Sequence, residues 1–294
     1  MQTAELVMKH SSETTAEAKS SLAGMKSMLF HVHNDDGLDD RLQIALTMAR
    51  TFGAHLHLLH VTPIEAYALN DGFTNLVSTE VIDILESESS DLKSRLEHQL
   101  GNEDVSWSYE QITGSEMPRL IQRAALADLV FVSRQPYSRE FGPAGISLLG
   151  DMLHRIKSPL FLPGGLKAEF DPFGPAMVAW NGSYEAANAL RAAIPMLKIA
   201  SRVRLVSVEE AKEDQFPSTA ALEYLSRHGI HAELVQRPLI ADTTEDQLLD
   251  HAIGDRVSYM VMGGYGHTRA GEFFFGGVTR SLLRECPTSL VIAH

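Results

Sequence analysis

The passage "AMVAWNGSYEAANALRAAIPMLKIASRVRLVSV", residues 176–208, decides the fold. It opens with a short apolar run, continues through the polar residues "NGS", and closes with a second apolar run, "RVRLVSV". Ser183 follows Gly182 and is suited to accept the first free N–H groups of a helix. Between the two runs the apolar residues recur at helical spacing: Ala186, Ala189, Leu190, Ala193 and Leu197. The passage therefore predicts a strand, a helix and a second strand.

The same order of features occurs earlier in the chain, in "SMLFHVHNDDGLDDRLQIALTMARTFGAHLHLLHV", residues 27–61. Its helical positions are again apolar: Leu42, Ala45, Leu46 and Ala49. The acidic stretch "DDGLDD", residues 35–40, lacks the ligand spacing of a calcium-binding hand. It is better suited to the start of a helix, where negative charge is favoured. The chain thus contains an internal repeat.

The remaining segments of the two halves also correspond. Third strands are expected at 106–112 and 231–237, helices at 115–126 and 243–253, and buried fourth strands at "DLVFVS" (128–133) and "SYMVMG" (258–263). The runs "SPLFLP" (158–163) and "TSLVIA" (288–293) close the halves, and about residues 63–79 are inserted in the first. Alternating strands and helices predict an α/β fold of two doubly wound domains. Each is expected to have a five-stranded parallel sheet, in the order 3-2-1-4-5, with helices on both faces.

This pattern divides the chain into four parts. Residues 1–24 form a polar tail, 25–163 a first α/β domain, and 176–294 a second α/β domain. Between the domains, "GGLKAEFDPFGP" (164–175) is rich in residues that interrupt regular structure and is expected to be a linker.

The bulk composition limits the classes of partner. The chain has 294 residues and a formal net charge of −13, so nucleic acid and anionic membrane surfaces would repel it. It has no apolar run near the ~20 residues that span a bilayer, and its first residues lack a secretory apolar core. A cytoplasmic protein is expected. The single cysteine, Cys286, excludes an intramolecular disulfide and is expected to be a small buried side chain.

The glycine-rich stretch "VMGGYGHTRAGEFFFGGVTRSLL", residues 261–283, follows the fourth strand of the second half. In doubly wound sheets a ligand lies beyond the carboxyl ends of the strands, here between strands 1 and 4. Gly276 and Gly277 precede a short predicted helix, whose free N–H groups and dipole favour an anion, and Thr279 adds a hydroxyl. The alternative is a loop whose glycines only reverse the chain direction.

The spacing Gly263-x2-Gly266-x9-Gly276, on a unit that opens with "VAWNGS", resembles the motif of the universal stress protein family. About residues 25–294 look like a tandem pair of such domains. The ATP-binding members of that family use the motif to hold phosphates. The resemblance also implies that the final strands of two domains pair, here "SPLFLP" with "TSLVIA", as a pseudo-dimer within one chain. Two chains can then associate further as a homodimer.

The resemblance implies a set of adenine-nucleotide contacts in the second half, with ATP, accompanied by magnesium, as the expected ligand. The adenine and ribose contacts map to Asn181, Val208 and Met262. The phosphate contacts map to Gly263, Gly266, Gly276, Gly277 and the backbone of Val278, and His267 lies in the same loop. The sequence departs from the motif twice. Asn181 replaces an aspartate, and Gly277 replaces a serine or threonine, so a charge and a hydroxyl are lost.

The first half departs further from the motif. Ser133 and Pro136 stand at the first two glycine positions, and His33 stands at the aspartate position. Because Pro136 has no N–H to donate, this half is not expected to bind ATP as the family does. Arg134 and Arg139 are interpreted either as ligands of another anion or as solvated surface residues.

Four histidines alternate along the first two predicted strands: His31, His33, His55 and His57. They either bind zinc or copper or are half-buried side chains held by hydrogen bonds. The chain contains no recognisable pair of catalytic carboxylates and no hydrolase or metalloprotease motif. The expected function is that of a stress-response regulatory protein that binds nucleotide with little or no catalysis. The alternatives are an interaction scaffold that binds no nucleotide, and a slow ATPase.

Overall fold

The structure is a computed structural model that describes most of the chain outside the N-terminal region and several connecting segments. The described residues are 24–62, 69–70, 75–76, 79–134, 144–165, 170–208, 216–237, 243–264 and 277–294. Gly266, His267 and Gly276 of the expected site, and Pro136 and Arg139 of the first half, lie outside these ranges.

The first half alternates strands and helices along the chain, as its periodicity predicts. Its elements are β1 (Ser27–Val32), α2 (Leu38–Phe52), β2 (His55–Thr62), β3 (Leu69–Asn70), β4 (Asn75–Leu76), α3 (Thr79–Leu100), β5 (Trp107–Thr113), α4 (Glu116–Ala124), β6 (Leu129–Phe131), α5 (Ala144–Arg155) and β7 (Leu160–Leu162). The short strands β3 and β4 form a separate antiparallel pair inside the inserted segment.

The second half repeats this order with one additional short helix. Its elements are β8 (Ala176–Ala179), α6 (Tyr184–Ala192), α7 (Ile194–Leu197), β9 (Val203–Ser207), α8 (Ser218–Arg227), β10 (Ala232–Gln236), α9 (Thr244–Gly254), β11 (Tyr259–Gly263), α10 (Gly277–Glu285) and β12 (Ser289–Ala293). Ser183 caps α6 as expected, since its side chain accepts the N–H of Ala186.

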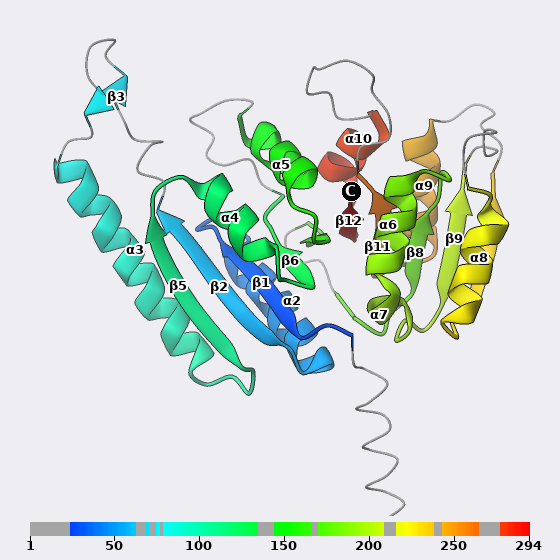
Figure 1. The fold of residues 1–294 in the computed structure, drawn as a ribbon, viewed down its shortest axis with the longest axis horizontal. Helices are drawn as coiled ribbons and strands as arrows, with labels where there is room; N and C mark the ends of the chain where they lie inside the picture. Colours follow the sequence, from blue (N-terminus) through cyan, green and yellow to red (C-terminus); the bar gives the residue numbers. More distant parts are fainter. Residues whose placement is uncertain are drawn as a thin grey trace, which may run out of the picture.

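The strand order agrees with the prediction, but the number of sheets does not. Each half is parallel in the order 3-2-1-4-5, and the halves join into one ten-stranded sheet, β10-β9-β8-β11-β12-β7-β6-β1-β2-β5 (Figure 1). The join is antiparallel between β7 and β12, with Val291 opposite Phe161. The expected pairing of the two final strands is therefore confirmed. Because that pairing is continuous, the two expected sheets are one mixed sheet.

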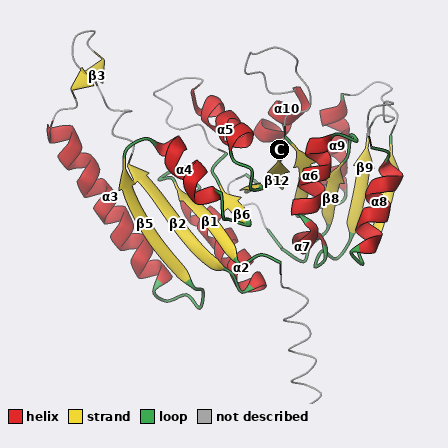
Figure 2. Cartoon of the chain, viewed as in Figure 1, coloured by secondary structure: helices red, strands yellow, loops and turns green. Residues whose placement is uncertain are grey.

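Helices cover both faces of the sheet (Figure 2). Side chains of β1 alternate between the two apolar layers: Phe30 faces the layer with α2, α3, α6 and α8, whereas Leu29 faces the layer with α4, α5, α9 and α10. Strands buried on both faces explain the near-continuous apolar runs of the sequence. Cys286 is buried in the second layer, as expected.

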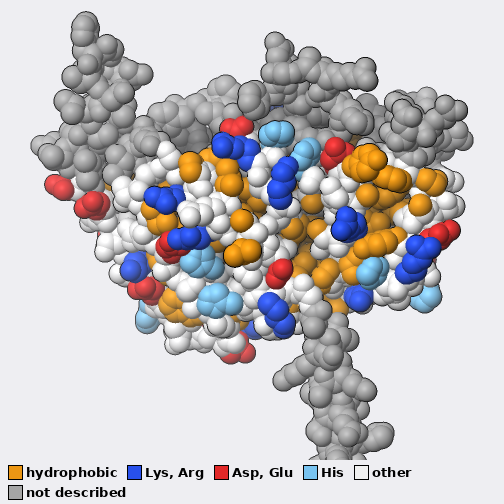
Figure 3. Space-filling model, viewed as in Figure 1, with side chains coloured by type: hydrophobic (Ala, Val, Ile, Leu, Met, Phe, Trp, Pro, Cys, Tyr) orange, Lys and Arg blue, Asp and Glu red, His pale blue; other side chains and the backbone are white. Residues whose placement is uncertain are grey.

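Two further observations concern the charged side chains of the surface and the apolar character of the helices. On the face shown in Figure 3, lysine and arginine side chains are spread over both halves and stand among acidic and histidine side chains. None of the helices in the described ranges combines the length and apolar character that crossing a membrane requires.

Candidate functional site

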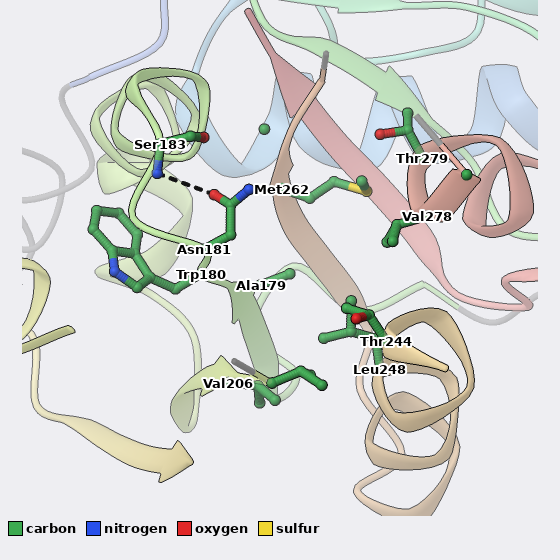
Figure 4. A pocket seen from close by; sticks show the side chains of 13 residues that line it. Ala179, Trp180, Asn181, Ser183, Val206, Thr244, Leu248, Met262, Val278 and Thr279 are labelled. Carbon is green, nitrogen blue, oxygen red and sulfur yellow. Dashed lines mark hydrogen bonds between the residues drawn. The ribbon is translucent and has the colours of Figure 1, made fainter. Parts of the chain in front are cut away.

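A cavity of about 250 Å³ opens at the carboxyl ends of the strands in the second half (Figure 4). It lies where β8 and β11 are neighbours, which is the position that fold topology assigns to ligands in such sheets. Its lining comes from β8, β9 and β11, the first turns of α9 and α10, and the loop after β8. The lining residues are Ala179, Trp180, Asn181, Ser183, Val206, Val208, Thr244, Leu248, Met262, Gly263, Gly277, Val278 and Thr279.

One side of the cavity is apolar. Val206 and Val208 come from the end of β9, Leu248 from α9, and Met262 from β11. Val206, Leu248 and Met262 belong to the same apolar layer of the core. The space between these valine, leucine and methionine side chains suits a flat, weakly polar ring. Transfer of such a ring from water into an apolar cavity is favourable.

The other side carries hydrogen-bonding groups and no charged side chain among the lining residues. The side-chain oxygen of Asn181 accepts the backbone N–H of Ser183 at 3.1 Å. Figure 4 shows the amide nitrogen of Asn181 pointing the other way, toward the side of the cavity formed by Met262. Asn181 therefore offers a donor to a ligand, whereas an aspartate would offer only acceptors.

The start of α10 supplies further donors. The first N–H groups of a helix have no acceptor within that helix, so those of Gly277 and Val278 are available to an anion. Thr279 is 7% exposed and lines the cavity. In Figure 4 its hydroxyl points toward the cavity. The hydroxyl is therefore placed to exchange a hydrogen bond with a ligand there.

Gly263 has a packing function that is independent of any ligand. A Cβ at this position would lie 2.5 Å from the backbone nitrogen of Ala186 and 2.7 Å from the carbonyl carbon of Glu185. The glycine therefore allows the first turn of α6 to approach the end of β11. It also places Ser183 and Asn181, which precede α6, beside the cavity.

The structure brings six of the nine expected site residues to this cavity: Asn181, Val208, Met262, Gly263, Gly277 and Val278. The other three, Gly266, His267 and Gly276, lie outside the described residues. Thr244 and Leu248 of α9 were not expected in the wall. The capping box of α9, in which Thr243 and Asp246 exchange hydrogen bonds, marks the start of that helix and is readable in "TTED".

The corresponding position in the first half is occupied by side chains. When the runs 128–133 and 258–263 are aligned, strand pairing places His31 where the second half has Ala179. Glu116 is the first residue of α4, as Thr244 is the first residue of α9. His31 Nε2 lies 2.6 Å from Glu116 Oε1, and His31 is fully buried. This pair takes up space that two small residues leave open in the second half.

A second polar group lies at the end of β1. Ser133, which aligns with Gly263, donates to Asp35 Oδ2 at 2.7 Å, and Arg41 donates to Asp35 Oδ1. Burial disfavours ionisation of Asp35, but Arg41 and Ser133 hold its pKa below the usual value. Burial, followed by repulsion from His31, lowers the pKa of His33 to about 4. At neutral pH the end of β1 therefore holds a neutral imidazole beside a paired carboxylate.

The two terminal side-chain nitrogens of Arg134 donate hydrogen bonds within the protein. Its guanidinium donates to the backbone carbonyls of Cys286, Thr288 and Leu162. Both sequence interpretations of this residue, as an anion ligand and as a solvated side chain, are therefore wrong.

The histidines of the first two strands have hydrogen-bonding or ionic partners. His55 contacts the hydroxyls of Ser106 and Ser108, and His57 contacts Ser108 and Glu110. These contacts agree with the hydrogen-bonding alternative for both residues. Among the described residues, no group of three His, Cys, Asp or Glu side chains is placed to hold a metal ion.

Comparison with known proteins shows a likeness in structure rather than in sequence. No family model and no curated protein matches the chain. A universal stress protein from Archaeoglobus fulgidus superposes with a TM-score of 0.71 at 15% identity, over 92% of this chain and 97% of the other. A functionally unknown protein from Pseudomonas aeruginosa superposes with a TM-score of 0.59 at 13% identity, over 94% of each chain.

Each superposition covers more than nine tenths of both chains, so the likeness includes both halves. The first of these structures is a protein of the family whose motif the sequence resembles. The chain therefore has the fold of a universal stress protein, with two α/β units in tandem.

Proposed function

We propose that the chain is a stress-response regulatory protein that binds an adenine nucleotide, ATP in the first instance, in the cavity of its second half. The nucleotide base would lie in the apolar slot beside Val206, Leu248 and Met262. The phosphates would lie at the start of α10, where Gly277 leaves open space and the first helix N–H groups have no acceptor within the helix.

One observation carries this proposal. The buried hydroxyl of Thr279 and the start of α10 form one donor-rich wall, which faces an apolar wall across a cavity at the topological position for ligands. A ligand that suits both walls has a flat ring at one end and an anionic group at the other. Magnesium would arrive with the phosphates, because none of the described lining residues carries a carboxylate.

The proposed role is regulatory because none of the described residues that line the cavity could activate water. General bases are side chains such as histidine or a carboxylate within hydrogen-bond reach of the nucleophile, and the lining residues include neither. The two rival functions remain testable. The scaffold alternative requires no nucleotide affinity, and the slow ATPase requires phosphate release that depends on the cavity.

The test is calorimetric titration of nucleotide-stripped protein with Mg-ATP, comparing the wild type with Gly277→Asp. A Cβ at Gly277 would have no atom within 4 Å, so the variant fits the fold while its carboxylate enters the phosphate region. Gly165→Asp is the matched control, since it also adds a carboxylate in open space, away from the cavity lining.

We expect one site per chain, retained in Gly165→Asp and lost in Gly277→Asp. Two sites would show that the His31–Glu116 pair does not close the first half. No heat at millimolar ATP, together with no thermal shift, would favour the scaffold. Phosphate release that exceeds that of Gly277→Asp would establish the ATPase alternative.

A further inference from the structure

Arg134 connects the two halves of the chain at a specific point. It lies just after β6 in the first half, and its guanidinium reaches the turn between α10 and β12 in the second half. There it donates to the carbonyls of Cys286 and Thr288, on either side of Pro287. Burial lowers the pKa of Arg134 to about 10, which leaves the guanidinium charged at neutral pH.

The helix that ends at this turn is the helix that begins in the cavity. α10 runs from Gly277 to Glu285, and its first three residues line the cavity. Nine residues of α-helix are about 13 Å long and behave as a short rigid rod. A cation held at the carboxyl end also interacts favourably with the helix dipole. Fixing that end therefore restricts where the donors at the other end can lie.

Among the described residues, the position that matches Arg134 in the second half carries no such side chain. In the alignment of the two halves, Arg134 corresponds to Gly264, and the turn at Cys286 corresponds to the turn at Ile156 after α5. Gly264 has no side chain to reach across, and a Cβ there would lie 2.8 Å from Ile292 Cγ2. Arg134 of the first half thus contacts the turn that ends α10 in the second half. Gly264 supplies no equivalent contact to the turn after α5.

We propose that Arg134 is a positioning residue for the cavity, through which the first half sets the ligand affinity of the second. The proposal rests on the proposed function for its ligand, but its structural part concerns α10 alone. Without the guanidinium, the carbonyls of Cys286 and Thr288 lose their donor in a largely buried place. The turn then rearranges to recover hydrogen bonds, and α10 moves with it.

The experiment compares Arg134→Met and Arg134→Lys with the wild type. Methionine keeps much of the aliphatic length but donates nothing, and lysine keeps the charge but can no longer donate from two nitrogens at once. Arg123→Met is the matched control. Arg123 is paired with Glu110 in the first half and has no contact with the turn or the cavity.

Two quantities are measured well below the melting temperature of every variant. The first is the Kd for Mg-ATP by calorimetry, and the second is hydrogen exchange of the amides of α10 and, for comparison, α9. For Arg134→Met we expect binding weakened about tenfold, within the range typical of coupled sites, and faster exchange in α10 but not in α9. Arg134→Lys should have a Kd and an α10 exchange rate between those of the wild type and Arg134→Met. Arg123→Met should match the wild type in both quantities.

Wild-type affinity and wild-type exchange in Arg134→Met would overturn the proposal. A general loss of structure would accelerate exchange in α9 as well as α10, which would also overturn it. If the wild type itself bound no ATP while Arg134→Met still loosened α10 selectively, the nucleotide assignment would be wrong and the role of Arg134 in holding α10 would stand.

Discussion

Acidification should destabilise the first half through His60, at the carboxyl end of β2. His60 is 8% exposed, and its Nδ1 lies 2.8 Å from the hydroxyl of Tyr109 on β5. Burial lowers the pKa of His60 to about 4, with a further decrease from His31 on β1 that Glu116 on α4 opposes. In the folded state the imidazole therefore stays neutral and accepts the Tyr109 O–H, while in the unfolded chain it takes up a proton near its ordinary pKa of 6.5.

The sign and size of the effect follow from proton linkage. Because the folded pKa is depressed, the contribution to stability is complete above pH 6.5 and is lost as the pH falls toward 4. With pKa values of 6.5 unfolded and about 4 folded, the free energy of unfolding should fall by about 2 kcal/mol at pH 5 and by about 3 kcal/mol at pH 4, from this residue alone.

The assay compares the wild type with His60→Asn, whose side-chain oxygen can still accept from Tyr109 but does not titrate in this range. Urea unfolding is measured at pH 7.5 and pH 5 with a probe in the first half. The free energy of unfolding should fall between these pH values by about 2 kcal/mol less in the variant than in the wild type. NMR titration of the His60 ring provides a direct measure of its pKa. A ring pKa near 6.5, or equal acid losses in the two proteins, would refute the reasoning.

Two substitutions at glycines of the cavity should have opposite consequences. Gly277→Ser adds a hydroxyl in open space at the start of α10. One added hydrogen bond of ~1 kcal/mol should tighten Mg-ATP binding about fivefold, as measured by calorimetry. An unchanged affinity would mean that the phosphates lie elsewhere. Gly263→Ala brings a methyl group against the backbone of α6, and this overpacking should cost about 1–3 kcal/mol in chemical denaturation, whereas wild-type stability would show that α6 can shift freely.

Much of the fold could be predicted because it depends on local periodicity. The strand at 27–32 and its repeat at 176–179 are short apolar runs followed by helical spacing, and each occurs where it was expected. The antiparallel join between β7 and β12 is different. Nothing in "SPLFLP" or "TSLVIA" alone specifies a partner, and only the family resemblance indicated the pairing.

The site could be predicted in part for the same reason. Asn181, Val208 and Met262 were mapped onto strand ends from the family resemblance, and all three line the cavity. Leu248 is an apolar residue on a helix, and its pattern cannot distinguish a cavity wall from a packed core. Arg134 was misread because its partners lie up to 154 positions away, in a turn that the local sequence does not connect to it. His31 and Glu116 are 85 positions apart in the sequence, and that pair could not be predicted for the same reason.

The antiparallel join of the two halves has a genetic consequence. Where two identical subunits pair through their last strands, every substitution appears on both sides of the contact and must suit both. Here the two sides are encoded separately, so an arginine can stand at 134 while the matching position keeps Gly264. The partners also share one polypeptide and cannot be diluted apart. The two halves can therefore differ in sequence at matching positions without losing the strand pairing that joins them.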